Sequence, residues 1–319
     1  MSGAGTSSAN PPAASGSASA PRTIRRRRPR DGGWLVAAAF LFPSAVFLVL
    51  FVLVPTGQAF YLSLFDWNGL AADMNYVGLG TFIAAITDPR LLASLLLTLI
   101  WWIMHLVLAV GSGLLLATII ARLTAGRAIF RTLLFLPHVL SLSVVGVVWA
   151  QIYHPSIGLL NDILKSVGLR FLIQAWLGNT NTVLPAIGVA SAWQAYGFYM
   201  VIYLAAIQGI SRELYEAARM DGANVLQEFW HVTLPGLYNA TTTVMVLAFI
   251  SALKGFGSVW AMTQGGPGTS TELVSVYLYR EAFQYGEVSK AAAGGLILGV
   301  IVIVITMLFN RWRDRGMHS

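Results

Sequence analysis

The sequence contains no cysteine and few charged residues. Of its 319 residues only 10% are Asp, Glu, Lys or Arg, whereas 56% are hydrophobic. Without cysteine, a disulfide framework, a thiolate metal site and a cysteine nucleophile are all excluded. Soluble domains carry about a quarter charged residues. A chain as apolar as this one therefore needs lipid as part of its solvent.

Nucleotide-binding and catalytic signatures are also missing. A phosphate-binding P-loop needs a lysine directly after a glycine, and neither Lys165, Lys254 nor Lys290 follows one. No His, Asp or Glu cluster has metal-ligand spacing, and no nucleophile stands beside a base. We therefore expect a protein that is not an enzyme and that holds no cofactor or metal itself.

Long apolar runs dominate the sequence after residue 30. We predict an all-α integral membrane protein whose membrane domain, residues 31–319, has about six transmembrane helices. The predicted spans are approximately 35–55, 91–121, 132–152, 182–208, 236–262 and 291–310. Each is about 20 residues or longer, which is enough to cross a bilayer. None contains Asp or Glu, and Lys254 in the fifth is the one charged side chain within them.

The first 30 residues form a separate, basic segment. Residues 1–21 are mostly Ser, Ala, Gly and Pro without charge, and six arginines follow between Arg22 and Arg30. Such a composition buries too little apolar surface to fold, so we predict a disordered tail. The arginines favour a topology signal that keeps the tail in the cytoplasm. A nucleic-acid-binding arm is the minor alternative, and we expect no nucleic-acid partner.

The distribution of basic residues predicts the orientation. With the N-terminus inside and six alternating spans, fourteen Lys and Arg lie on the cytoplasmic side and five on the outer side. This excess agrees with the positive-inside rule. Both termini and the polar segment 211–235 are therefore predicted to lie in the cytoplasm.

Segment 211–235 is the most highly charged interruption between two apolar runs. Ser211 can cap a helix, and Glu213 is favourable in the first turn of that helix. Asp221 and Gly222 predict a break, because glycine adopts a positive φ at little cost. A second helical piece follows, and Pro235 marks the start of the next span. The pattern predicts a helix, a break and a helix with a face of small residues.

This segment resembles the EAA loop of the membrane subunits of ABC importers. The residues that carry the resemblance, and that we predict to couple the chain to an ATPase, are Glu216, Ala217, Ala218, Asp221, Gly222, Ala223, Leu234 and Pro235. Thr263–Pro267 resembles the T-x-GGP element of the carbohydrate branch of these permeases. The family often has proline where Ser211 stands here.

The resemblance implies a fold, a function and partners. The fold would be that of a type I ABC importer permease in the bacterial inner membrane, surrounded by lipid. The partners would be a second homologous permease in a heterodimer, two ATPase subunits that bind ATP and Mg²⁺, and an external solute-binding protein. The cytoplasmic loop would dock into a groove of the ATPase. Glu216 would pair with a donor on the ATPase, while Ala217, Ala218 and Gly222 would permit close approach.

A substrate path is predicted from the fourth and fifth spans. Trp193, Tyr196, Met200 and Tyr203 lie on one stripe of a helix, and aromatic rings can stack on the apolar faces of sugars. The predicted path residues are Trp193, Gln194, Tyr196, Tyr199 and Lys254. Packing, or rings at a membrane interface, is the alternative for the aromatic residues. Lys254 could instead pair with the partner permease or extend to one side of the membrane.

Two other functional classes remain open at this stage. An ion-gradient-driven carrier would need intramembrane carboxylates or broken helices arranged as repeats. An integral membrane enzyme acting on lipids would need a clustered catalytic set. The sequence favours the translocating subunit of an ATP-driven importer for a sugar or sugar derivative, and it does not identify the sugar.

Overall fold

The computed structural model describes residues 3, 5 and 33–316 of the chain. The chain divides into two compact units, Met1–Pro55 and Thr56–Ser319. Apart from residues 3 and 5, the tail predicted at residues 1–30 lies outside the described part. About 75% of that part is helical, as expected for an all-α membrane protein.

The first predicted span is one apolar helical run that crosses the boundary between the two units. It consists of α1 (Gly33–Leu48), the π-helical turn η1 (Val49–Leu53) and α2 (Val54–Leu62). Its membrane-length stretch, Ala37–Leu62, has none of its most apolar window buried inside the chain. A short hairpin of β1 (Phe65–Asp66) and β2 (Asn75–Tyr76) follows.

The second predicted span is a helix of 34 residues. After α3 (Gly80–Ile86), it comprises α4 (Pro89–His105), the π-helical turn η2 (Leu106–Val110) and α5 (Gly111–Arg122). Asp88 caps the start of α4 by accepting a hydrogen bond from the Arg90 backbone N–H at 2.8 Å, and Pro89 occupies the first helical turn. Local sequence therefore sets where this span begins.

The third predicted span, 132–152, is not one straight helix. It is divided into α6 (Arg127–Val139) and α7 (Leu142–Ile152), which meet at a bend of 93°. Ser141 has an extended backbone and caps α7 through its side chain, which accepts from the Val144 N–H at 3.3 Å. This break could not be predicted from the apolar run, because hydropathy stays high where one helix ends and the next begins.

The fourth predicted span is the buried helix α9 (Val183–Gln208), preceded by α8 (Leu159–Ser166) and the 3₁₀ turn η3 (Arg170–Leu172). Fourteen of its 26 residues are buried. It packs against α4 to α7 and against α13 (Tyr238–Leu253). A Cβ on Gly197 would lie 2.6 Å from the Leu134 carbonyl oxygen, so glycine is what lets α6 approach α9 this closely.

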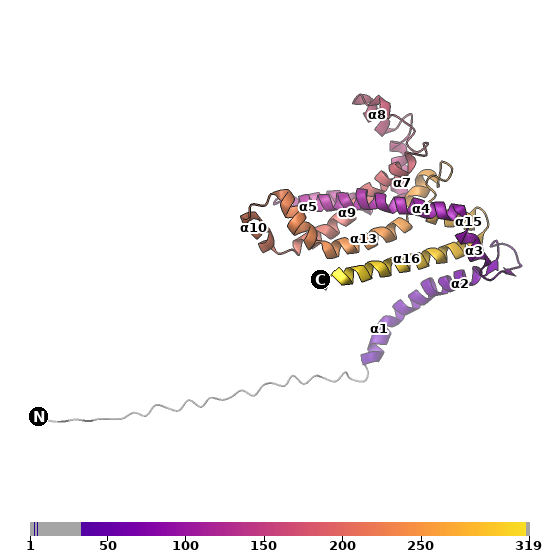
Figure 1. Ribbon diagram of the computed structural model, residues 1–319, viewed down its shortest axis with the longest axis horizontal. Coiled ribbons are helices and arrows are strands. Elements are labelled where there is room, and N and C mark those ends of the chain that lie inside the picture. The colour runs from indigo at the N-terminus through magenta and orange to yellow at the C-terminus, as the bar shows by residue number, and fades with distance from the viewer. Residues whose placement is uncertain (1–2, 4, 6–32, 317–319) are drawn as a thin grey trace. The chain divides into compact units, whose positions relative to one another are not determined.

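The remaining helices form the loop at residues 211–235 and the C-terminal third of the chain. They are α10 (Arg212–Met220), α11 (Val225–Glu228), the π-helical turn η4 (Phe229–Thr233), α12 (Leu234–Gly236), α13, α14 (Phe256–Thr263), α15 (Val274–Phe283) and α16 (Val288–Gly316). Figure 1 shows α10 at one end of the long helices and α3 and α15 at the other.

Four helices of the described part are long and apolar enough to cross a membrane, or five if the bent α6–α7 pair is counted as one span. The helix α9 is not among them, because it carries polar and aromatic side chains along its length. Other helices surround it, so protein replaces lipid as its environment. At about 1.5 Å per residue it is still long enough to span a bilayer.

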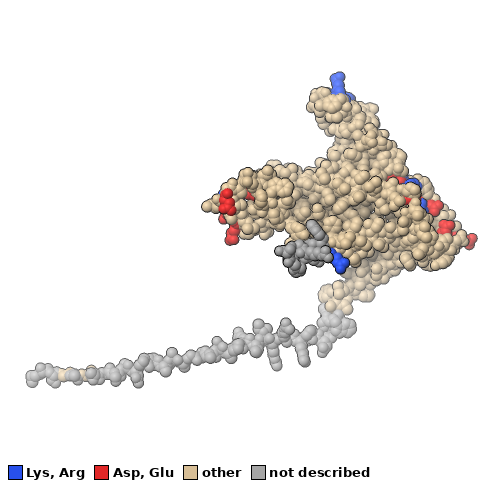
Figure 2. All heavy atoms as spheres, in the orientation of Figure 1, with Lys and Arg blue, Asp and Glu red and all other residues tan. Residues whose placement is uncertain are grey.

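On the face that Figure 2 shows, no charged side chains are visible along the middle of the long helices. They gather at the end that carries α10, at the opposite end, at α8 and near the end of α16. An uncharged band between charged ends is the surface that a bilayer requires.

Candidate coupling site

The helix α10 begins and ends where its local sequence predicts. The Ser211 side chain accepts a hydrogen bond from the Glu213 N–H at 3.3 Å. Arg212 Nε donates to Glu216 Oε1 at 2.9 Å, one helical turn apart, on the side of α10 that lines a groove toward α5. Glu216 and Ala217 are exposed and Ala218 is half-buried. A partner protein can therefore reach Glu216 and Ala217.

The turn after α10 is a Schellman motif. The Gly222 N–H donates to the Arg219 carbonyl at 3.0 Å, and the Ala223 N–H donates to the Ala218 carbonyl at 2.9 Å. Gly222 has a φ of +80°, which an L side chain rarely adopts. A Cβ there would meet nothing within 4 Å, so the backbone faces open space. Asp221 is the C-cap of the helix.

The second half of the loop starts with a capping box. Asn224 accepts from the Gln227 N–H at 3.0 Å, and Gln227 Oε1 accepts from the Asn224 N–H at 2.8 Å. The chain then continues through η4 to α12, where Leu234 and Pro235 occupy the first turn. Pro235 is exposed and Leu234 is half-buried. Proline is tolerated at this position because a first-turn N–H has no helical partner.

Glu228 is a buried carboxylate that the sequence analysis missed. Its Oε1 accepts from Arg219 Nε of α10 at 2.6 Å, and its Oε2 accepts from Arg122 Nη2 of α5 at 3.0 Å. The hydrogen bond from Arg219 is the main cause that holds the pKa of Glu228 below its usual range. We call Arg122, Arg219 and Glu228 the Glu228 triad. Its only sequence signal is an acidic residue among apolar neighbours.

Behind α10 lies a groove of about 980 Å³. It is bounded by α5, by the end of α9 and by the loop itself, and its apolar lining includes Leu115, Ile119, Ile207, Leu226 and Phe229. No residue of α10 is buried. The Tyr215 hydroxyl lies 3.0 Å from Thr233 Oγ1 and provides a second polar contact between α10 and the rest of the loop.

Two large apolar side chains of α10 are exposed. Met220, next to the Schellman turn, is 88% exposed, and Leu214 is 55% exposed. These residues precede a turn whose backbone is open to the surroundings. Methionine is enriched at protein interfaces, so an exposed Met220 is compatible with a docking surface.

The opposite end of the bundle holds a second charged cluster. We call Asp88, Arg90, Glu272, Arg280, Glu281 and Lys290 the six-charge cluster. Arg90 bridges Glu272 and Glu281, with both N–O distances 2.9 Å, and Arg280 Nη1 donates to Glu272 at 2.8 Å. Lys290 bridges Asp88 at 2.5 Å and Glu281 at 3.2 Å. The cluster joins the starts of α4 and α16 to α15.

The predicted substrate-path residues do not share one environment. Gln194 is buried, and its Nε2 donates to the carbonyls of His138 and Leu140 at 3.3 and 3.1 Å, where α6 ends. Tyr199 is buried, and its hydroxyl lies 2.9 Å from His105 Nε2. Both side chains therefore have partners within the bundle.

The other three path residues are more accessible. Trp193 and Tyr196 are half-buried on α9, and Trp193 meets the Trp149 ring edge-on at 5.9 Å. Lys254 is exposed at the C-terminus of α13, where the chain breaks before α14. Lys254 thus lies at the short break between α13 and α14, within the membrane-length stretch Tyr238–Thr263.

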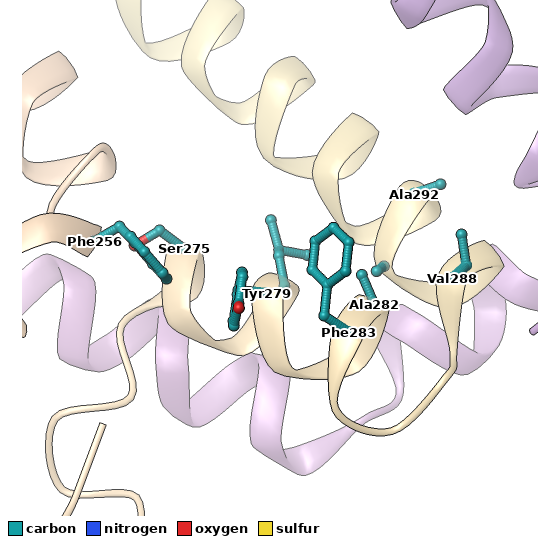
Figure 3. Close-up of a pocket in the computed structure, with 9 residues that line it drawn as sticks. Phe256, Ser275, Tyr279, Ala282, Phe283, Val288 and Ala292 are labelled. Atoms are coloured by element: carbon teal, nitrogen blue, oxygen red, sulfur yellow. The ribbon is translucent and has the colours of Figure 1, made fainter. Parts of the chain in front are cut away.

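An aromatic hollow of about 420 Å³ lies between α14, α15 and α16. Figure 3 shows Phe256, Tyr279 and Phe283 around it, with Ser275 at one side. The Trp260 ring does not line the hollow but packs against Tyr279, with a centroid distance of 4.6 Å. Among the described residues, no group of three or more His, Asp or Glu could hold a metal ion.

A bundle of membrane-length helices with an exposed helix-turn-helix loop at one end is the architecture of a transport permease. Residues 33–318 match the family described as "Binding-protein-dependent transport system inner membrane component", and the chain belongs to this family. The probable ABC transporter permease protein YurN of Bacillus subtilis is 33% identical over 287 residues, covering 89% of this chain and 98% of that protein. The diacetylchitobiose uptake system permease protein NgcF of Streptomyces coelicolor is 35% identical over 309 residues, 92% of this chain and 87% of that protein.

A solved structure shares the fold. The chain superposes with a TM-score of 0.76 and 26% identity on a permease of a bacterial alginate ABC transporter, solved with its alginate pentasaccharide-bound periplasmic protein, covering 88% of this chain and 94% of that one. The predictions of a type I importer permease fold and of an ABC importer permease are confirmed. The chain is a multi-pass inner-membrane transport subunit and not an enzyme, and the ATPase is a partner subunit.

Proposed function

We propose that the chain conducts a sugar or sugar derivative across the membrane and is driven by an ATPase docked on residues 211–235. The observation that carries this proposal is the geometry of the loop. The helix α10 has no buried residue, and the turn that follows it contains Gly222, whose surroundings are open. The coupling residues are then Glu216, Ala217 and Ala218 on the helix, Asp221 to Ala223 at the turn, and Leu234 and Pro235 at the exit.

The substrate class is inferred from relatives. One relative is named for diacetylchitobiose uptake, and the related solved transporter imports alginate, so both act on saccharides. Trp193 and Tyr196 present half-buried rings that can stack on a sugar, and exposed Lys254 can hydrogen-bond its hydroxyls. Gln194 and Tyr199 would support this surface from behind, because both are already bonded within the bundle.

We further propose the assembly and orientation. The chain would pair with a second homologous permease, bind two ATPase subunits that hold ATP and Mg²⁺, and receive substrate from a solute-binding protein. The related structure was solved with such a periplasmic protein. Both termini and the 211–235 loop would face the cytoplasm, in agreement with the positive-inside rule.

Reconstitution tests the function. Proteoliposomes that contain this chain, its sister permease, the ATPase and the binding protein should take up sugar only when ATP is supplied on the ATPase side. Omitting the ATPase should abolish uptake. Uptake by this chain alone, driven by an ion gradient, would instead establish a secondary carrier.

Single cysteines test the docking face and the orientation, because the natural chain has none. Met220→Cys lies at the exposed end of α10, and Thr269→Cys, the control, lies in the exposed connection before α15. In intact cells an impermeant maleimide should label Thr269→Cys but not Met220→Cys. In inverted vesicles, added ATPase should protect Met220→Cys from labelling. Labelling of Met220→Cys from outside would contradict the proposed orientation.

A further inference from the structure

The helix α10 is attached to the rest of the chain by polar contacts rather than by apolar packing. None of its residues is buried, and a groove of about 980 Å³ lies between it and α5. Its side-chain attachments to other elements are the Tyr215–Thr233 contact and the Arg219–Glu228 ion pair. A force applied to α10 by a docked ATPase must therefore pass through these contacts and through the backbone.

Two routes lead from α10 into the membrane helices. The backbone route runs through α11, η4 and α12 to α13, which follows directly in the chain. The second route is ionic, because Glu228 Oε1 binds Arg219 of α10 while Glu228 Oε2 binds Arg122 in the last turn of α5. Arg122 Nη2 also lies 3.5 Å from the Val225 carbonyl, at the start of α11. One carboxylate thus joins α5, α10 and α11.

The ionic route continues into the centre of the bundle. The helix α5 packs along α9, and a Cβ on Gly113 would lie 2.8 Å from Tyr199 Cβ and 2.9 Å from the Tyr196 carbonyl oxygen. Helices in such close contact move together, because packed interiors resist compression. A displacement of Arg122 therefore reaches the helix that carries the proposed substrate-path residues.

We propose that Glu228 is a positioning residue that transmits movement of α10 to α5, so that α5 and α13 move as one body during transport. This inference rests on the proposed docking of an ATPase on α10. The exposure of the three side chains fits a connection that can move rather than a rigid one. The carboxylate is 4% exposed, whereas the Arg122 and Arg219 side chains are 39% and 61% exposed. Both arginines can change conformation while they keep their charged hydrogen bonds.

The test uses the complete transporter in proteoliposomes, with three measurements for each variant: ATPase co-purification, ATP hydrolysis, and sugar transported per ATP hydrolysed. Glu228→Gln keeps the size of the side chain but removes its charge. We expect the ATPase to co-purify and to hydrolyse ATP, and transport per ATP to fall about tenfold. Arg122→Gln should have the same effect, and adding it to Glu228→Gln should cause little further loss.

Two further variants keep the test decisive. Arg122→Lys retains the charge, so its transport per ATP should be close to that of the natural protein and well above that of Arg122→Gln. If Arg122 acted only through its shape, Arg122→Lys would lose transport per ATP as well. Asp162→Asn removes a carboxylate paired with Lys165 at 3.1 Å on α8, away from the loop, and should transport like the natural protein. Unchanged transport per ATP in both Glu228→Gln and Arg122→Gln would overturn the proposal.

Other outcomes separate this proposal from the proposed function. If the ATPase no longer co-purifies with the variants, the triad serves docking rather than transmission, and the proposal fails. If Glu228→Gln does not accumulate in the membrane, the test rests on transport per ATP in Arg122→Gln and Arg122→Lys, because Arg122 is half-exposed and its substitution should not prevent folding. If the ATPase does not co-purify even with the natural chain, the proposed coupling itself is wrong.

Discussion

The two ends of the helical bundle use charge in different ways. In the six-charge cluster three acidic side chains balance three basic ones, and Asp88, Glu272 and Glu281 are at most 11% exposed. In the Glu228 triad one carboxylate faces two arginines that are 39% and 61% exposed. In the cluster, Arg90 is 37% exposed, but Arg280 and Lys290 are only 16% and 23% exposed. The cluster joins the starts of α4 and α16 to α15. The triad joins a short surface helix to the end of one long helix.

The comparison shows that ion pairs between carboxylates and basic side chains can either hold helices rigidly or permit movement. Buried carboxylates with several bonded partners cannot lose one without leaving another charge uncompensated. The Tyr277 hydroxyl, which donates to Asp88 at 2.8 Å, and the Gln264 carbonyl, which accepts from Arg280 at 2.6 Å, complete the cluster. The exposed arginines of the triad can be hydrated when a contact opens. We infer a fixed end at α15 and an adjustable end at α10.

The largest expected effect comes from opening the six-charge cluster. Glu272→Gln should destabilise the fold by about 3–5 kcal/mol, because Arg90 and Arg280 would both lose their shared carboxylate at a buried position. Thermal unfolding of the purified protein in detergent measures this. Glu287→Gln, at an exposed carboxylate between α15 and α16, is the matched control and should unfold like the natural chain. Equal unfolding temperatures for both variants would show that the cluster does not fix this end.

The second prediction concerns the turn at the adjustable end. Gly222→Val forces a β-branched residue into the left-handed region at a cost of about 1–2 kcal/mol, but a Cβ meets nothing within 4 Å. The chain should still fold, while the side chain projects into the proposed ATPase interface. Transport should be lost while ATP hydrolysis continues. Gly222→Asn tolerates the backbone conformation and should lose less transport, and normal transport by Gly222→Val would refute the docking of this turn.

The sequence predicted the local features of this loop because each depends on neighbouring residues. Ser211 caps α10, Gly222 ends it with a positive φ, and Pro235 lies in a first helical turn. The same reasoning located the long apolar helices. These features need no knowledge of distant parts of the chain.

Features that depend on distant residues were not predictable. Arg122 and Glu228 are 106 positions apart, and Arg90 and Glu281 are 191 apart. Each looks like an isolated surface charge in the sequence. Likewise, the uninterrupted hydropathy of residues 132–152 hides the bend between α6 and α7. Gln194, more than 50 residues away, binds the carbonyls at the end of α6, so the break is stabilised from another helix.

The third prediction is that protonation of Glu228 at low pH weakens its ion pairs with Arg122 and Arg219. The folded-state pKa of Glu228 lies below its ordinary value of 4.5. Its contribution to stability is therefore present above pH 4.5 and is lost as the pH falls through the folded pKa. Hydrogen exchange of the α10 amides, corrected for intrinsic rates, should speed up on acidification below that value. Glu228→Gln should exchange faster already at neutral pH, with a smaller further change in acid. Identical pH profiles would show that Glu228 does not hold α10.

The smallest expected effect is at the first residue of the loop, where the family often has proline. Ser211→Ala removes the side-chain acceptor for the Glu213 N–H and should cost about 0.5–1 kcal/mol of helix stability. Ser211→Pro should recover most of this loss, because the φ of −58° at Ser211 matches the value that proline imposes. Circular dichroism of the whole chain is too coarse for such a change, so hydrogen exchange of the first turn of α10 is the suitable measurement. Because α10 is held by polar contacts rather than packing, fraying at its start should leave the Arg219–Glu228 pair intact and transport per ATP unchanged. Loss of coupling in Ser211→Ala would mean that the adjustable end depends on the whole of α10, and that the triad alone does not define it.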